Sequence, residues 1–144
     1  MKNAHLILAF AVFFVSCSVK PEPLALGKDA CYACKMTLMD ERFGGEIVTK
    51  KGKVYKFDDL NCMINFSKSG YEPKDNIALQ LVVDYAHPGN LVDVQKTSYC
   101  KSEQIKSPMA GQAAAFEKRE DLEQYNSEWK GAVLTWAELI KQSQ

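Results

Sequence analysis

The sequence predicts an α+β protein built from two ββαβ units in tandem. Strand-like apolar runs alternate with short amphipathic segments, and the order strand, strand, helix, strand occurs twice. A composition of 47% hydrophobic and 25% charged residues is typical of a folded protein. The 144 residues include 18 basic and 18 acidic side chains, so the formal net charge is zero. Without a basic stripe, we expect no nucleic-acid partner.

The N-terminal segment resembles a secretory signal. Lys2 supplies a positive charge before an unbroken apolar run at residues 6–15. A membrane-spanning helix needs about 20 apolar residues, so this run is too short to be one. We therefore expect residues 1–16 to be a signal peptide.

A lipid anchor is expected directly after this signal. Residues 14–17 (Phe-Val-Ser-Cys) resemble a bacterial lipoprotein cleavage box, although Phe14 stands where leucine is usual. The alternative is an ordinary cleaved signal with Cys17 merely nearby. We expect Cys17 to be lipidated and residues 17–28, which contain two prolines, to form a tether between membrane and folded region.

The folded region is expected at residues 29–144, with a first unit at about 29–85. Its expected elements are a strand at 46–50, a strand at 53–57, a helix capped by Asp58 or Asp59 and ending before Gly70, and a strand at 77–83. The first two strands flank Lys51-Gly52, which predicts a β-hairpin. The helix boundaries follow from the capping residues at its two ends.

The second unit, at about 86–144, is expected to repeat the first. Its expected elements are a strand at 91–94, a strand at 112–116, a helix at 120–125 and a strand at 132–134. The alanines of the second of these strands would by themselves favour a helix. A terminal helix should begin at Thr135, because Thr135 and Glu138 have the spacing of a capping box.

Cys31 and Cys34 form a CxxC motif, and Lys35 and Met36 follow it. A c-type haem site would have histidine in place of Lys35. Structural zinc would need a second pair of ligands, and neither another CxxC nor paired histidines are present. A thioredoxin-like redox pair should follow a core strand and open a helix, whereas this motif follows a tether. Haem and zinc are therefore disfavoured, and a redox pair stays open.

Met36 directs the interpretation towards copper. A thioether two residues after a thiol adds a soft donor, and soft donors select Cu(I). Lys35 is also expected to lower the pKa of the neighbouring thiol.

Other candidate metal ligands are weaker, because buried cysteines, packing methionines and turn histidines are common in proteins without a metal. They are Cys62, Met63, His87 and Met109. Export favours disulfides, and the pairing state of Cys31, Cys34, Cys62 and Cys100 stays open.

Together these motifs resemble the NosL-like accessory lipoproteins of nitrous oxide reductase. The resemblance rests on the lipoprotein start, the CxxC with Met36, Phe57-Asp58-Asp59 with Cys62-Met63, Val83-Asp84-Tyr85, and Ser107-Pro108-Met109 ahead of Phe116. It implies a fold similar to that of organomercury lyase. It also implies Cys31, Cys34, Met36 and Met109 as metal ligands. Lys35 replaces the glycine often found between the second cysteine and the methionine, which affects the expected loop geometry more than the ligands.

The function implied by this resemblance is that of a Cu(I) chaperone and not of an enzyme. Such a protein is anchored on the periplasmic side of a bacterial membrane, expected here to be the outer membrane. It supplies copper for the maturation of nitrous oxide reductase in denitrification, and its partners are a membrane maturation complex and the reductase apoprotein.

An enzyme is the alternative: a thiol-disulfide oxidoreductase that uses Cys31 and Cys34, or a lyase on the related fold. An enzyme needs a base or resolving group near the thiol. Asp84 or His87 could serve, but nothing in the spacing places either of them there.

Overall fold

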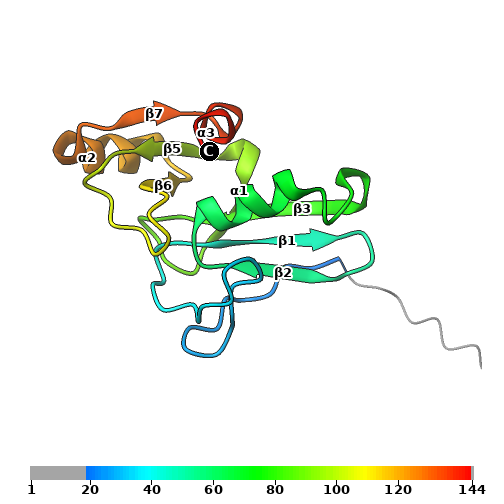
Figure 1. Ribbon diagram of the computed structural model, residues 1–144. Coiled ribbons are helices and arrows are strands. Elements are labelled where there is room, and N and C mark those ends of the chain that lie inside the picture. Colours follow the sequence, from blue (N-terminus) through cyan, green and yellow to red (C-terminus); the bar gives the residue numbers. More distant parts are fainter. Residues whose placement is uncertain (1–18, 144) are drawn as a thin grey trace, which may run out of the picture.

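A computed structural model describes residues 19–143 (Figure 1). The predicted signal peptide and the lipidation of Cys17 lie outside these residues. Within the described part, the chain forms two antiparallel sheets, three α-helices and two short 3₁₀ helices. None of these helices is long and apolar enough to cross a membrane. The predicted α+β class is confirmed.

The first sheet has the strand order β2-β1-β3-β4. Its unit comprises β1 (Gly45–Thr49), β2 (Val54–Phe57), α1 (Leu60–Ser69), the 3₁₀ helix η1 (Lys74–Asn76), β3 (Ile77–Val83) and β4 (Leu91–Asp93). The predicted hairpin, helix and strand are all present. Asp59 caps α1 by accepting a hydrogen bond from the Asn61 N–H, and Gly70 ends it with a φ of +69°. Figure 1 shows α1 lying along one face of this sheet.

The second sheet has the order β6-β5-β7. After the 3₁₀ helix η2 (Val94–Lys96), its unit comprises β5 (Ser98–Lys101), β6 (Ala113–Phe116), α2 (Arg119–Trp129), β7 (Ala132–Leu134) and α3 (Trp136–Gln142). In both units the first strand lies between the second and the strand after the helix, and all pairs are antiparallel. The predicted capping box between Thr135 and Glu138 is present at the start of α3.

The strand that opens the second unit differs from the prediction. The strand expected at 91–94 forms as β4 but pairs with β3, so it belongs to the first sheet. The partner of β6 is β5, which the sequence did not indicate. In β5, Tyr99 packs in one core cluster and Cys100 in the other, and both side chains are fully buried. A strand covered on both faces lacks the polar–apolar alternation by which strands are recognised.

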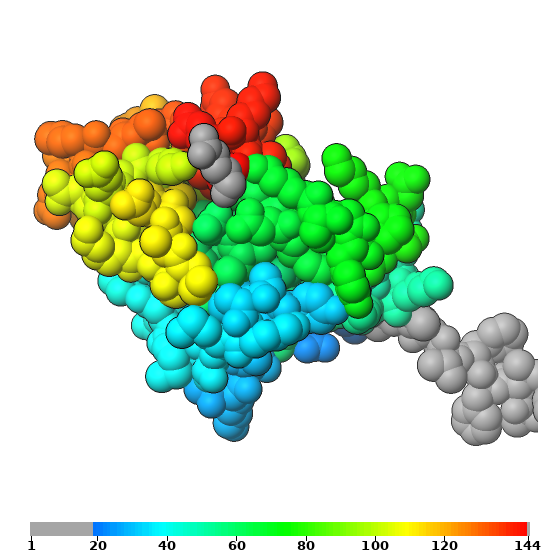
Figure 2. Space-filling view, in the orientation of Figure 1, coloured from blue at the N-terminus to red at the C-terminus, as the bar shows by residue number. Residues whose placement is uncertain are grey.

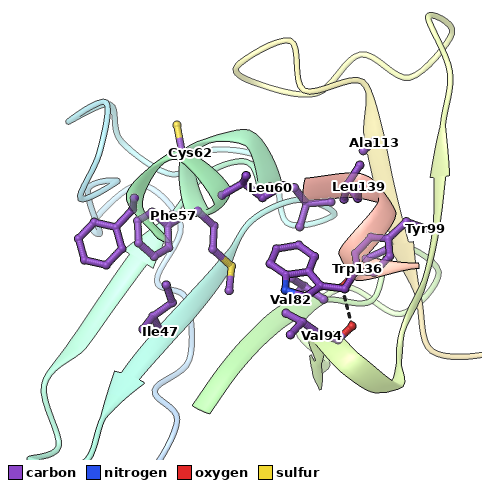
Figure 3. Packing of buried hydrophobic residues seen from close by; sticks show 14 of the residues in the cluster. Ile47, Phe57, Leu60, Cys62, Val82, Val94, Tyr99, Ala113, Trp136 and Leu139 are labelled. Atoms are coloured by element: carbon purple, nitrogen blue, oxygen red, sulfur yellow. Dashed lines mark hydrogen bonds between the residues drawn. The ribbon is translucent and has the colours of Figure 1, made fainter. Parts of the chain in front are cut away.

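One hydrophobic core joins the two units. Figure 3 shows Val82 of the first sheet beside Trp136 of the second unit, and Ile47 and Tyr99 belong to the same cluster. The alanines of β6 are buried on both faces, since Ala113 and Ala115 pack in this core while Ala114 and Phe116 pack in the other. Small side chains here allow the second sheet to lie close to the first. The site residues are therefore supported by a shared core.

Candidate metal centre

Cys31 and Cys34 lie in a tight loop before the first sheet. The Cys31 N–H donates to the Met36 carbonyl at 2.8 Å, and the Lys35 N–H donates to the Cys31 carbonyl at 2.9 Å. An isolated bridge between Ala30 and Thr37 closes the loop. The loop holds both thiols on one turn, with Cys31 fully buried and Cys34 half-buried.

Lys35 occupies the one left-handed position of this loop, with a φ of +66°. Glycine adopts this conformation without strain, so a lysine at this position carries a backbone cost. The lysine side chain compensates locally. Its Nζ donates to the Tyr32 carbonyl at 2.6 Å and lies 4.2 Å from the centre of the Tyr32 ring.

Four potential ligands converge beside this loop. The Sγ atoms of Cys31, Cys34 and Cys62 and a carboxylate oxygen of Asp58 all lie within 4.8 Å of one another. Cys62 lies in the first turn of α1, and in Figure 3 its side chain points away from Ile47 and Val82. The Cys34 thiol donates to Asp58 Oδ2 at 3.4 Å. The structure thus adds Asp58 to the predicted pair and brings Cys62 to it.

Adjacent aspartates have separate roles at the start of α1. Asp59 is fully buried, caps the helix with Oδ1 and accepts the Met109 N–H at 2.8 Å with Oδ2. Asp58, one residue earlier, is therefore not needed as the cap and faces the thiols. Its Oδ1 atom is buried and has no hydrogen-bond partner among the described residues. A buried carboxylate oxygen without a partner is costly unless a cation or proton binds there.

The three thiols differ in acidity. The Cys62 thiol hydrogen-bonds to Cys31 and lowers the pKa of Cys31 to about 6. The same hydrogen bond raises the pKa of Cys62, and burial raises the pKa of Cys34. Lys35 was expected to lower the pKa of the neighbouring Cys34 thiol, but it is not among the causes, and the pKa of Cys34 is raised. Cys31 is therefore the thiol of the cluster that most readily takes the thiolate form that binds metal.

This donor set fits a soft metal ion. With a metal–sulfur distance of about 2.3 Å, tetrahedral ligand atoms lie about 3.8 Å apart, so ligands within 4.8 Å need to move little. Thiolates bind both Cu(I) and Zn(II) well. The orphaned Asp58 oxygen can serve as a further ligand. The cluster can therefore hold one metal ion at the start of α1.

The methionines have different positions around the cluster. Met36 follows Cys34 in the same loop, and its side chain is 58% exposed. Met109 is partly buried, and the hydrogen bond from its N–H to Asp59 holds its loop beside α1. In Figure 2 the yellow segment containing this loop lies against the blue and cyan N-terminal segments. Met63 is fully buried and its sulfur packs over Gly45, so it belongs to the core and not to the cluster. Met39, which the sequence did not single out, is 73% exposed.

His87 does not join the thiols. It lies beside Asp84 and Asp121, which form a second group of potential ligands. Asp58 was the functional candidate that sequence reasoning missed, although a signal was available. Asp58 and Cys62 are four residues apart across the start of a helix, and residues at this spacing face the same side.

The fold and the site together define a small α+β protein with a buried, thiol-rich candidate site for a soft metal ion. The profile of the NosL family matches residues 23–144. The chain belongs to the NosL family, and the resemblance described above is confirmed.

The solved structures include a similar fold. The crystal structure of the copper chaperone NosL from Shewanella denitrificans has a TM-score of 0.65 and 16% sequence identity, covering 84% of this chain and 96% of that one. At this identity the similarity shows the fold. No curated protein matches the chain.

Proposed function

We propose that this protein is a Cu(I) carrier. The observation that supports this most directly is the convergence of three thiols and a carboxylate at one point. Thiolate sulfur is the ligand that Cu(I) prefers. Membership of the NosL family and a fold shared with a copper chaperone point to the same cargo.

The exposure of the site suits transfer. Cys31 is fully buried, whereas Cys34 is half-buried and Met36 is largely exposed. A partner can thus approach the copper from the side of Cys34 and displace the ligands one at a time. Cu(I) tolerates low coordination numbers, so the ion stays bound while ligands exchange. This asymmetry favours a carrier over a storage protein.

We further propose that the copper is delivered for the maturation of nitrous oxide reductase. The recipients would be a membrane maturation complex and the reductase apoprotein, as the family resemblance implies. The signal-like start and the lipoprotein-like box at Cys17 support anchoring on the periplasmic side of a bacterial membrane, with the outer membrane as the expected location. Cys17→Ala should release the protein from membranes into the soluble fraction. If the variant still sediments with membranes, the anchor is not a lipid on Cys17.

A thiol-disulfide oxidoreductase is less well supported. In such enzymes the reactive cysteine begins a helix and is accessible, whereas Cys31 is fully buried in a loop. We therefore propose a carrier and not an enzyme. Reduction of insulin disulfides by the metal-free protein, faster than by the Cys31→Ser variant, would favour the enzyme instead.

Competition titration tests the choice of metal. The reduced protein should take one Cu(I) from a chelator and should keep it in the presence of excess Zn(II), because thiolates bind Cu(I) more tightly. Cys100→Ser is a matched control, since Cys100 is a buried cysteine whose thiol bonds to Asn126 Oδ1 at 3.2 Å, outside the cluster. Equal displacement of copper by zinc would overturn the proposal.

A further inference from the structure

A second group of ligand-type side chains lies where the two units meet. His87 Nδ1 is 2.8 Å from Asp84 Oδ2 and 3.8 Å from Asp121 Oδ2. One ligand atom from each of the three residues lies within 4.8 Å of the other two. Asp84 directly follows β3, His87 lies in the turn beyond it, and Asp121 lies in the first turn of α2. No residue of the thiol cluster takes part.

The negative charge of this group is not balanced by the protein. The Asp84 side chain is fully buried, and its oxygens meet only the Ala86 N–H and His87. The Oδ2 atom of Asp121 is buried without a hydrogen-bond partner among the described residues. In residues 19–143, no lysine or arginine pairs with either carboxylate. A protonated imidazole would neutralise one carboxylate, whereas a divalent cation would neutralise both.

The neighbouring charged groups do not compensate. Arg42 is engaged with Asp40 at 2.7 Å, and Arg119 pairs with Glu123 at 2.8 Å. The N-terminal end of α2 favours an acidic residue such as Asp121, but this interaction leaves the buried Oδ2 atom without a partner.

We propose that Asp84, His87 and Asp121 bind a divalent cation of the Zn(II) type. Tetrahedral zinc with ligands at about 2.0–2.1 Å has ligand atoms about 3.4 Å apart. The two separations from His87 Nδ1, 2.8 Å and 3.8 Å, lie on either side of this value. Imidazole and carboxylate suit zinc, whereas Cu(I) prefers the sulfur ligands of the other site. The His87 side chain is 51% exposed, which leaves an entry path and room for water as a fourth ligand.

Such an ion would link the two units. Asp84 belongs to the end of the first sheet and Asp121 to the helix of the second unit. Beside them, the Tyr85 N–H donates to the Ala115 carbonyl at 2.8 Å, and Asn90 Nδ2 donates to Glu117 Oε2 at 3.0 Å. An ion bound only in the folded state raises stability by mass action. Zinc should therefore strengthen the connection between α2 and the first sheet, independently of copper.

Zinc titration with the thiols removed from competition tests this proposal. The full chain is used in two forms, one loaded with Cu(I) under anaerobic conditions and one in which the three cluster cysteines are replaced by serine. The serine form keeps the test valid even if the protein does not bind Cu(I). Calorimetry should show one Zn(II) bound in both forms, with a higher melting temperature. His87→Gln and Asp121→Asn should each lower zinc affinity by about 100-fold.

Glu117→Gln is the matched control, because Glu117 is an exposed carboxylate on the same surface that bonds to Asn90 outside the trio. It should leave zinc binding unchanged. His87 is the one histidine in residues 6–144, so its imidazole NMR signals report on the site directly. Zinc should shift these signals in the wild type and not in Asp121→Asn. The proposal fails if neither form binds zinc, if Glu117→Gln weakens binding as much as Asp121→Asn, or if zinc leaves the His87 signals of the wild type unchanged.

Discussion

Cys62→Ser should remove copper binding almost as effectively as Cys31→Ser. Cys62 supplies one of the three thiols that lie within 4.8 Å of one another and of Asp58. Four-ligand structural zinc sites in small peptides bind with about 10–16 kcal/mol, which is about 2.5–4 kcal/mol per ligand. Losing one thiolate should therefore lower Cu(I) affinity by about 10²- to 10³-fold.

The assay is competition with a Cu(I) chelator of known affinity under anaerobic conditions. Serine is close to cysteine in size, so circular dichroism and the melting temperature should change little. Cys100→Ser makes the same change at a fully buried cysteine outside the cluster and should leave affinity within about threefold of wild type. If Cys62→Ser binds copper as tightly as Cys100→Ser, Cys62 is not a ligand and the three-thiol site is wrong.

Four further outcomes are expected. Copper binding should weaken as pH falls, because the thiols release protons when they bind the metal. About two protons should leave at pH 7, and about three below the Cys31 pKa of about 6. A copper affinity independent of pH would exclude thiolate ligands. Met36→Leu and Met109→Leu should each weaken copper binding by about tenfold and keep the fold, since neutral thioethers bind less tightly than thiolates. Chelator competition measures this affinity. A loss of affinity as large as that of Cys31→Ser would contradict the prediction. Oxidation of Cys31 and Cys34 to a disulfide should abolish binding until reduction restores it, and retained binding by a sample shown by mass spectrometry to be oxidised would be inconsistent with this. Burial raises the pKa of Glu46 to about 7, so the folded state favours the neutral carboxyl group. The stability that depends on this neutral group is fully present below the ordinary pKa of 4.5 and is lost as pH rises through 7. In the wild type the free energy of unfolding, measured in urea, should fall by about 3 kcal/mol across this pH range, and Glu46→Gln should remove this fall. An unchanged pH dependence in the variant would show that Glu46 is not its source.

The sequence alone determined the features that depend on local chemistry. The hairpin around Lys51-Gly52, the start of α1 and the capping box at Thr135 involve residues a few positions apart, whose turn and capping preferences operate within one segment. The CxxC motif of Cys31 and Cys34 is local in the same sense. Family membership also followed from the order of the motifs along the chain, without knowledge of where each side chain points.

The tertiary structure decided what depends on contacts between distant segments. Strand β4 could be recognised locally, but its pairing with β3 depends on which sheet has a free edge. Asp58 and Cys62 join Cys31 and Cys34 because α1 packs beside the N-terminal loop, 24 or more residues away from it in the chain. His87 faces Asp121 because the turn after β3 packs against α2. A local pattern carries no information about such long-range neighbours, since hydrophobic packing of the whole chain sets them.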